Sequence, residues 1–473
     1  MTTDRAASPG GAPTPAPTGT PTFTGTGTPT PTDTPTSTGA PVPTGKPAPT
    51  GKPTPTDPPA SPTPAPPTTP TDFTTALQTA ARIAVLSPSS HNCQPWAVAW
   101  ARSPASRAAA ARLVGDAEPG GDLVPRARPP EDGSGDGTYR YLVLGLDRSR
   151  SLRSLPAHAV EMLLSCGLHW QLLLRALDAQ GWTVDALRFA EGPADAEPVR
   201  GAELPGAAWP RSWAALCVAR LRAVPAGAEH AEELRTLSAA ARARRTNRAP
   251  YRPHPVQPAL LDGLLTPSGA AAARGADVTV RHLTSGADRA AFADFVARHG
   301  GRDFRHRAAW RETHAYLRSN EIEAAARGDG FAIDRLFGPL PWPHRQVMRA
   351  ALAPATMRIL SHVGYHRLLA SRLAHLVRPT PVVVAMSFAR TEPTLADAVK
   401  GGARLADYWL CATGAGLALH PVSVVLQHDD LRAALQSRLG IAGRAFFMSR
   451  LGWPATEFPV SPRRPADASL RTI

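Results

Sequence analysis

Apolar residues recur along this chain with a helical period in two long stretches and as dense short runs elsewhere. The stretches 157–180 and 396–413 predict long buried helices, and Gly181 is expected to close the first one. The apolar spacing across 73–86 predicts a third helix, which Ser87-Pro88 should end. The runs that predict strands are 97–100, 139–146, 213–221, 277–283, 381–388 and 446–451.

The order of these elements repeats along the chain. Helix, strand, long helix and strand occur once before residue 226 and once after it, with further helices expected at 228–243, 256–265 and across 286–327. We therefore expect an α+β fold in which two α/β sandwich halves, 71–225 and 226–473, form an intrachain pseudo-dimer. The proline-containing stretch 330–379 is expected to be irregular, as is the loop 115–137. An insertion or lid is expected at about 302–379.

Composition separates the first 70 residues from the rest. They hold 21 of the 51 prolines, 21 threonines and a single aromatic residue, Phe23. Such a segment buries too little apolar surface to offset the entropy of ordering, so a disordered tail is expected at 1–70. A glycosylated stalk, or a Pro-rich segment that recruits a partner, is an alternative for it.

The charges of the tail cancel, so the net charge of +14 lies on 71–473, and nearly all of it is arginine. A basic surface can bind nucleic acid or anionic lipid. However, no Lys/Arg block with interleaved aromatic residues and no nucleic-acid-binding motif occurs, so no nucleic-acid partner is expected. A compositional preference for arginine over lysine explains most of the excess. A few arginines that hold a ligand phosphate are the sharper alternative.

The remaining features of the composition argue against a metal site and against a membrane-spanning segment. The cysteines at 93, 166, 217 and 411 are far apart and have no histidine at metal-ligand spacing, so no metal site is expected. No basic segment followed by an apolar one begins the chain, and no apolar run reaches 18 residues. We therefore expect a soluble cytoplasmic protein with no membrane partner.

Four short motifs carry the chemistry, and they are spread over both halves. They are SPSSHNCQPW at 87–96, RRTNR at 244–248, GLALHPVS at 416–423, and the pair RLGWP at 450–454 and SPRRP at 461–465. Taken in this order, they resemble the nitroreductase superfamily, in particular its double-length Acg-like branch. The resemblance covers about residues 73–468.

The resemblance implies an FMN site. Arginine forks suit a phosphate dianion, and short neutral donors and acceptors suit the edge of a flavin ring. The implied ligands of the phosphate are Arg244, Thr246, Arg248, Arg463 and Arg464. The implied contacts of the ring are Ser89, Ser90, Asn92 and the turn formed by Pro421, Val422 and Ser423. No catalytic side chain is implied.

Each of these residues also has a structural interpretation. Ser90 and Asn92 suit a turn after the first helix, RRTNR suits a helix end, and Arg463 and Arg464 suit a solvated tail. His91, Trp96 and Trp409 are more often packing residues than ligands.

The motifs are complementary between the halves. The first half has PSSHN without an arginine pair, and the second has RRTNR with Thr266-Pro267-Ser268-Gly269 in place of PSSHN. One composite site per chain is therefore expected, in a monomer or a weak homodimer.

The leading hypothesis is an FMN-dependent oxidoreductase that moves hydride or electrons from NAD(P)H or a substrate to an organic acceptor. The alternative is a non-catalytic flavin-binding or flavin-storage protein in which 302–379 covers the flavin.

Overall fold

The computed structural model describes residues 69–115, 139–195, 209–266, 277–338 and 340–473, all of which belong to the unit Pro64–Ile473. The predicted tail lies outside the described residues except for its last two positions. The predicted loop lies outside them except for Gly115, and so does most of the segment 266–269.

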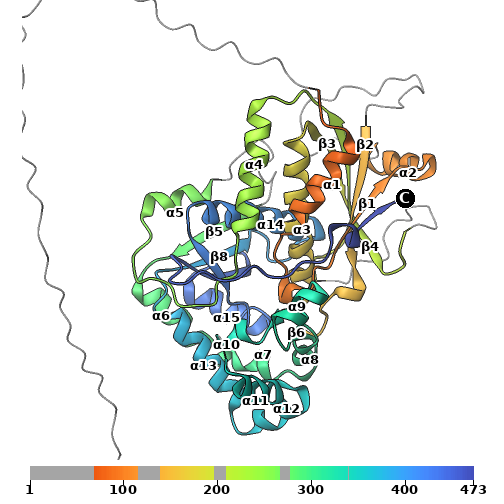
Figure 1. Ribbon diagram of the computed structural model, residues 1–473. Helices are drawn as coiled ribbons and strands as arrows, with labels where there is room; N and C mark the ends of the chain where they lie inside the picture. Colours follow the sequence, from red (N-terminus) through yellow and green to blue (C-terminus); the bar gives the residue numbers. More distant parts are fainter. Residues whose placement is uncertain (1–68, 116–138, 196–208, 267–276, 339) are drawn as a thin grey trace, which may run out of the picture. The chain divides into compact units, whose positions relative to one another are not determined.

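Two long helices pack against each other at the centre of this unit (Figure 1): α3 (His158–Asp178) and α14 (Leu395–Gly414). Their backbones meet at Gly167 and Gly402. A Cβ atom on Gly167 would lie 2.0 Å from the carbonyl oxygen of Val399, and one on Gly402 would lie 2.2 Å from that of Leu164. Only glycine allows this approach. Both helix predictions are confirmed, and the packing of the two helices joins the two halves.

The first sheet has the strand order β11-β1-β2-β4-β3. Four of its strands come from the first half, and their neighbouring pairs are antiparallel: β1 (Trp96–Ala101), β2 (Tyr139–Asp147), β3 (Trp182–Phe189) and β4 (Trp213–Ala223). The fifth, β11 (Leu470–Thr472), lies beside β1 in parallel, with Val98 opposite Leu470. The second half therefore completes the sheet of the first.

The second sheet has the strand order β5-β8-β10-β9, with all neighbours antiparallel. Its strands are β5 (Val278–Leu283), β8 (Val382–Phe388), β9 (Ala418–Pro421) and β10 (Arg444–Gly452). Along the chain, the long helix of each half follows the second strand and precedes the third. In the sheet, the fourth strand lies between the second and the third. The identical topology establishes the internal duplication that the order of elements predicts.

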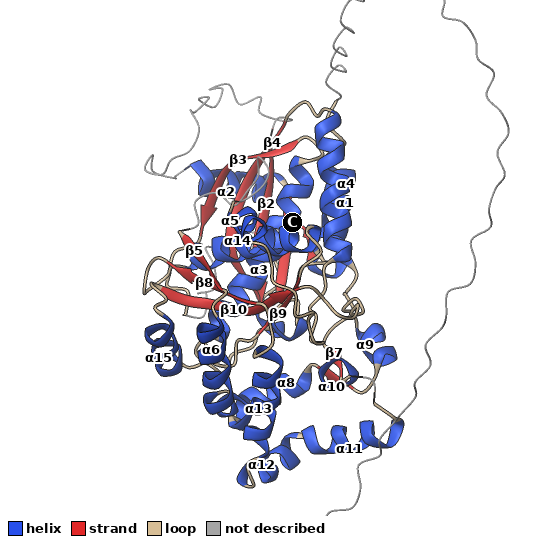
Figure 2. Cartoon of the chain, turned by 90° about the vertical axis from the view of Figure 1, so that its left-hand side faces the viewer, coloured by secondary structure: helices blue, strands red, loops and turns tan. Residues whose placement is uncertain are grey.

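Helices cover both faces of each sheet (Figure 2). On β8, Val382, Val384 and Met386 face α14, while Val383 and Ala385 pack with the opposite layer. That layer consists of α6 (Gly286–His299), α13 (Tyr365–Val377) and α15 (Asp429–Leu439). The other helices beside the sheets are α1 (Phe73–Ala84), α2 (Pro104–Gly115), α4 (Ala228–Ala243) and α5 (Pro258–Leu265).

The segment between β5 and β8 forms a lid of short helices. After α6 come α7 (Gly301–Arg305), α8 (Arg307–Ala315), β6 (Leu317–Arg318), α9 (Glu321–Arg327) and β7 (Phe331–Ala332). They are followed by α10 (Asp334–Phe337), α11 (Trp342–Leu352), α12 (Pro354–His362) and α13. The expectation of an irregular 330–379 was wrong. Pro343 and Pro354 occupy first-turn positions, where proline starts a helix instead of breaking it.

Five further elements were missed, namely the helices α2 and α15 and the edge strands β3, β9 and β11. The helix α2 is rich in alanine and begins beside Ser103, whose hydroxyl accepts from Ser106 N at 3.2 Å. The edge strands β3, β9 and β11 lack a strong alternating pattern, and pairing with longer neighbours defines them. No helix among the described residues is long and apolar enough to cross a membrane.

Candidate functional site

The loop between α1 and β1 has an unusual backbone. His91, Asn92 and Gln94 adopt positive φ angles of 52°, 54° and 53°, and they are the only non-glycine residues to do so in the described part of the chain. Each such residue costs on the order of 1–3 kcal/mol, and strain of this kind persists only where surrounding contacts impose it. The loop is therefore held in place by the rest of the structure.

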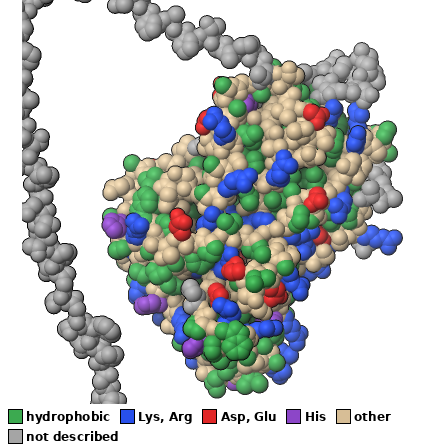
Figure 3. Space-filling view, in the orientation of Figure 1, with side chains coloured by type: hydrophobic (Ala, Val, Ile, Leu, Met, Phe, Trp, Pro, Cys, Tyr) green, Lys and Arg blue, Asp and Glu red, His purple; other side chains and the backbone are tan. Residues whose placement is uncertain are grey.

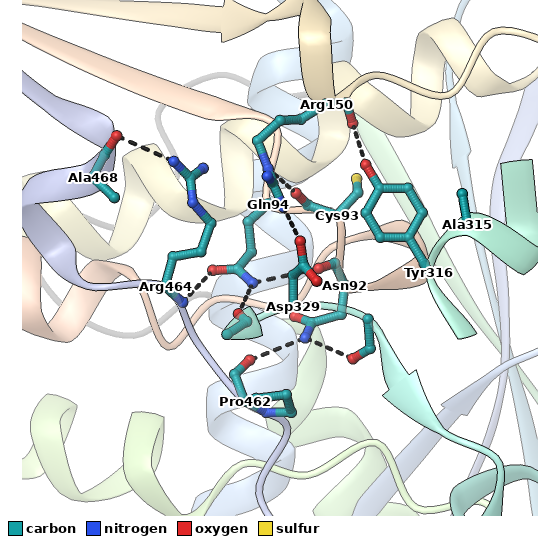
Figure 4. A network of polar contacts seen from close by, with 12 residues as sticks. Asn92, Cys93, Gln94, Arg150, Ala315, Tyr316, Asp329, Pro462, Arg464 and Ala468 are labelled. Carbon is teal, nitrogen blue, oxygen red and sulfur yellow. Dashed lines mark hydrogen bonds and ion pairs between the residues drawn. The ribbon is translucent and has the colours of Figure 1, made fainter. Parts of the chain in front are cut away.

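Asn92 is held by two distant segments (Figure 4). Its Nδ2 donates to the carbonyl oxygens of Gly330 and Pro462, each at 3.0 Å, and its Oδ1 accepts from Arg463 Nη1 at 2.8 Å. The buried amide is thus fully used in joining the loop to the lid and to the C-terminal segment. Asn92 therefore holds the loop in position. A ligand could contact only those atoms of Asn92 that these hydrogen bonds leave exposed.

Gln94 makes a second clamp between the same segments. Its Nε2 donates to Gly328 O at 2.7 Å, and its Oε1 accepts from the backbone N–H of Arg464 at 3.0 Å. Its own N–H donates to Ser89 Oγ at 2.9 Å. The sequence motif contains Gln94, but it was not among the expected site residues.

A buried ion pair fixes the lid beside this loop. Asp329 accepts from Arg150 Nη2 at 2.6 Å and from Arg318 Nη2 at 2.5 Å, and Arg150 Nε donates to Cys93 O at 2.6 Å. The two arginines hold the pKa of Asp329 below its usual value against the opposing effect of burial. No local pattern singles out these residues, because 150 and 329 meet only in the folded chain.

Two arginines from different motifs converge on one backbone carbonyl. Arg244 Nη2 and Arg463 Nη2 donate to Leu86 O at 2.9 and 3.2 Å. The Arg244 guanidinium also lies 5.1 Å from the ring centroid of Trp409. The Nε atoms of both arginines are buried without a hydrogen-bond partner among the described residues. The protein itself therefore leaves an N–H donor of each of these two arginines without a hydrogen-bond partner.

Arg248 adds a third positive charge. Its guanidinium lies 5.3 Å from the ring centroid of Phe331, and it makes no hydrogen bond or ion pair with any described residue. Among the described residues, no carboxylate forms an ion pair with Arg244, Arg248 or Arg463. The cluster has the properties of an anion site, since arginine forks bind phosphate oxygens in pairs.

Burial and mutual repulsion raise the cost of charge in this cluster. Burial, and then the neighbouring Arg335, lower the pKa values of Arg248 and Arg463 to about 10. Burial and the charge of Arg463 lower the pKa of Arg244 well below its usual value. A bound anion would reverse these shifts, because it would supply the missing opposite charge.

A cavity of about 810 Å³ opens beside the cluster and is lined by both halves and by the lid. From the first half come the loop 88–92 and one side of α3; from the second come Leu405 and Trp409 of α14 and the turn 420–424. The cavity is lined by nine of the eleven expected site residues: Ser89, Ser90, Asn92, Thr246, Arg248, Pro421, Val422, Ser423 and Arg463.

The other two expected residues lie outside the cavity lining. Arg244 contacts the cavity through Trp409, on which it stacks. Arg464 Nη2 donates to Ala468 O at 3.2 Å, so its side chain joins the C-terminal segment to itself. Arg464 therefore contributes to the site through its backbone N–H, which donates to Gln94.

The turn 420–423 is held in place by residues of β10. Arg450 Nη1 lies 3.1 Å from His420 Nδ1, and burial with the nearby Arg248 and Arg450 holds the pKa of His420 far below its usual value. The N–H of Val422 donates to Met448 O at 2.8 Å. Any backbone donor that this turn offers to a ligand is therefore not the N–H of Val422.

A chain of hydrogen bonds runs along the cavity wall. Ser90 Oγ donates to Glu161 Oε2 at 2.7 Å and lies 3.2 Å from His91 Nδ1, whose Nε2 lies 3.1 Å from Thr313 Oγ1. Gln427 Nε2 donates to the other oxygen of Glu161 at 2.6 Å. Burial lowers the pKa of His91 to about 3, so its ring is neutral at pH 7. No sequence pattern singles out Glu161, which lies inside an apolar helix.

Comparison with known proteins gives one extended sequence match. The chain is 29% identical over 400 residues to the probable NAD(P)H nitroreductase PigM of Serratia sp. (strain ATCC 39006), covering 85% of this chain and 94% of that protein. No family model matches the chain.

Solved structures match about half of it. The FMN- and NADPH-dependent nitroreductase NfnB of Sphigopyxis sp. strain HMH is 21% identical, with a TM-score of 0.29 and coverage of 49% of this chain and 96% of that one. The FMN-dependent nitroreductase NfnB of Mycobacterium smegmatis is 14% identical, with a TM-score of 0.28 and coverage of 47% and 88%. At such low scores, the two-half fold rests on the strand order and helix packing described above.

Proposed function

Because the chain belongs to the nitroreductase superfamily in a double-length form, we propose that it is an FMN-dependent oxidoreductase. It would take hydride or electrons from NAD(P)H or from a substrate and pass them to an organic acceptor. The observation that carries the proposal is the cluster of Arg244, Arg248 and Arg463, which has no carboxylate partner among the described residues and borders a cavity formed by both halves.

The residues present fit FMN. Arg248, Arg463 and Thr246 line the cavity and would hold the phosphate, with support from Arg244, which stacks on Trp409. The apolar walls contributed by α3 and α14 suit a flat ring system. When bound, FMN would supply the capacity to accept and donate a hydride, which none of these side chains possesses.

The protein's own residues would orient the ligands and exclude water. Ser89 and Ser90 are engaged with Gln94 and Glu161, so they would hold the loop shape against the ligand instead of reorienting toward it. The carboxylate of Glu161 could accept or return a proton through Ser90 at the cavity wall. A cytoplasmic location and a lack of nucleic-acid partners stay predictions.

The absorbance spectrum of the purified protein tests the proposal. We expect oxidised-flavin absorption and release of FMN, not FAD, on denaturation. Anaerobic mixing with NADPH or NADH should then bleach the flavin. A colourless protein that also fails to take up added FMN would overturn the assignment of the site.

One observation favours flavin storage as a second candidate function. Lid residues such as Phe304, Trp310 and Leu352 line the cavity, so the lid covers the ligand that the cavity would hold. If the lid stays closed, dithionite should bleach the flavin while NADPH and NADH do not. Rapid bleaching by a nicotinamide favours the oxidoreductase and argues against storage.

A further inference from the structure

The outward-facing side of the lid is unusually apolar. Trp342 and Val363 are 69% and 79% exposed, and three more large side chains on the same helices are exposed: Val347, Ile359 and Leu368. They lie on α11, α12, α13 and the turn between the last two, and α12 contacts both its neighbours. Hydrophobic side chains gather over α11 and α12 at the foot of Figure 3. These five residues are called the apolar lid patch.

The same segment carries only positive charge. Residues 340–378 contain six arginines and no aspartate or glutamate. Arg345 and Arg378 pair with Asp334 and Asp294 from outside the segment. The remaining four are exposed and form no ion pair or hydrogen bond with any described residue: Arg349, Arg358, Arg367 and Arg372.

The packing of the lid does not account for the apolar lid patch. Leu352 and Met357 form a small core with Trp310, and α13 lines the cavity through residues such as Leu369 and Leu376. None of the five patch residues belongs to that core or to the cavity lining. Single exposed hydrophobic residues are common, but five on three adjoining helices suggest a surface that meets a partner. Three of the four unpaired arginines, at 349, 358 and 367, lie on these helices outside the cavity lining, whereas Arg372 borders the cavity.

We propose that the outer side of α11–α13 docks on the surface of an anionic lipid bilayer. Helices that lie in a membrane interface combine exposed Trp, Leu, Ile or Val side chains with arginine or lysine and few acids. Each arginine near an anionic surface adds about a fivefold increase in affinity. The absence of acidic residues from 340–378 removes the repulsion that such a surface would otherwise meet.

This proposal departs from the expectation of no membrane partner, which rested on the lack of a spanning segment. It does not depend on the flavin, because none of the five residues of the apolar lid patch lines the cavity. Docking would bring the lid, and the cavity beneath it, to the bilayer surface.

Flotation of the full-length protein with lipid vesicles tests the proposal. We expect binding to vesicles of phosphatidylcholine mixed with phosphatidylglycerol, weak binding to phosphatidylcholine alone, and release by high salt. The double variant Arg358→Glu/Arg367→Glu should lower the partition coefficient at least about tenfold. Arg82→Glu/Arg102→Glu reverses two exposed arginines of the first half and should leave it unchanged.

A second pair of variants tests the apolar contribution. Val363→Ser should weaken vesicle binding about threefold or more, since it removes a side chain that would enter the interface. Ile322→Ser alters an equally exposed residue on α9, at 80%, and should have no effect. Melting temperature and flavin content should be unchanged in all these variants.

Three results would overturn the proposal: no flotation with anionic vesicles, equal flotation with neutral ones, or equal loss in the control variants. Light scattering distinguishes a different occupant. A dimer that Val363→Ser dissociates, in a protein that does not float, would show that the patch binds a second copy of the chain instead.

Discussion

The two halves of this protein share a frame and differ in what they place on it. The strand orders β1-β2-β4-β3 and β5-β8-β10-β9 are equivalent, and so are α3 and α14. Yet the strained loop follows α1 in the first half, while the arginines at 244 and 248 follow α4 in the second. Packing between the long helices constrains both copies, whereas the residues proposed to bind the ligand need to occur only once.

Two additions increase the difference. The edge of β1 is covered by β11, while β5 has no such neighbour among the described strands. The connection from β1 to β2 carries α2, whereas that from β5 to β8 carries the whole lid. Both additions serve the same cavity, since the segment leading to β11 and the lid both clamp the loop at Asn92. The duplicated frame therefore supports one site.

The largest expected effect concerns the number of flavins. The equivalent position in the second copy lacks at least three charge-assisted contacts, each worth about 1.5–3 kcal/mol. Its affinity for FMN should therefore be lower by a factor of about 1,000 or more. Titration of apoprotein with FMN, together with light scattering, should give one flavin per monomeric chain. Two equivalent flavins per chain would contradict the inequality of the halves.

The next effect concerns the shared frame. Gly167→Ala or Gly402→Ala places a Cβ against a backbone carbonyl of the opposite long helix, so each should destabilise the protein by about 3 kcal/mol or more. Urea unfolding measures the change. Gly263 lies in α5 with open space around it, so Gly263→Ala should stabilise by up to about 1 kcal/mol. Similar results for Gly167 and Gly263 would disprove the close approach.

A smaller effect separates the arginines within the cluster. Arg248→Ala should weaken FMN binding roughly 10- to 100-fold, because it removes a charge-assisted bond of about 1.5–3 kcal/mol. Arg464→Ala is the matched control and should change it little, since that side chain bonds Ala468. Fluorescence titration with FMN and with riboflavin measures both. Equal affinity of the wild type for the two flavins would refute the phosphate assignment.

The smallest effect concerns the contact between the lid and α3. Glu312 accepts from the backbone N–H groups of Arg153 and Ser154 at 2.9 and 3.1 Å, and its Oε2 lies 3.2 Å from His158 Nδ1. Despite burial, this partner raises the pKa of His158, while that of Glu312 falls to about 2. The pair therefore stabilises the closed lid fully between about pH 4.5 and 6.5. That contribution is lost as pH rises through the folded pKa of His158, or falls toward 2.

Quenching of the flavin by iodide measures this contact. Quenching should increase by up to about fivefold above pH 6.5 in the wild type, since an ion pair with one partly exposed member, here Glu312, contributes ~0.2–1 kcal/mol. In Glu312→Gln the dependence should be nearly absent. Asp303 also faces His158, and burial raises its pKa to about 7. In Asp303→Asn the contribution of this carboxyl should disappear, while the part of the pH dependence that comes from Glu312 should remain. An unchanged profile in Glu312→Gln would exclude the pair as the cause.

Much of the frame could be predicted from the sequence because periodicity reports burial. The stretches that became α3, α14, β2 and β8 are long and apolar, so their environment is evident locally. In contrast, β11 consists of Leu470, Arg471 and Thr472, and it is a strand only because β1 lies beside it. The lid helices α10 to α13 were missed because proline was taken as a helix breaker where it starts helices, whereas α7, α8 and α9 fall within the expected helical stretch 286–327.

The residues of the site likewise fall into those that a local sequence pattern indicates and those that it does not. Motif positions such as Ser90, Arg248 and Ser423 could be selected because their residue types suit a ligand, and the fold places them around one cavity. Glu161 lies within an apolar helix, and Arg150 and Asp329 are 179 residues apart, so nothing local links them. Whether any of these residues binds a cofactor stays a prediction.

The clamp on Asn92 has a consequence for biosynthesis. The strained loop is translated early, but its partners at 328–330 and 462–464 leave the ribosome several hundred residues later. Until then nothing imposes the positive φ angles, and the first sheet lacks β11 at its edge. The nascent first half must therefore wait with an exposed strand edge, a state that favours chaperone binding. On the proposed function, cofactor capture would be the last event of assembly, so a chain truncated before residue 462 should accumulate without flavin.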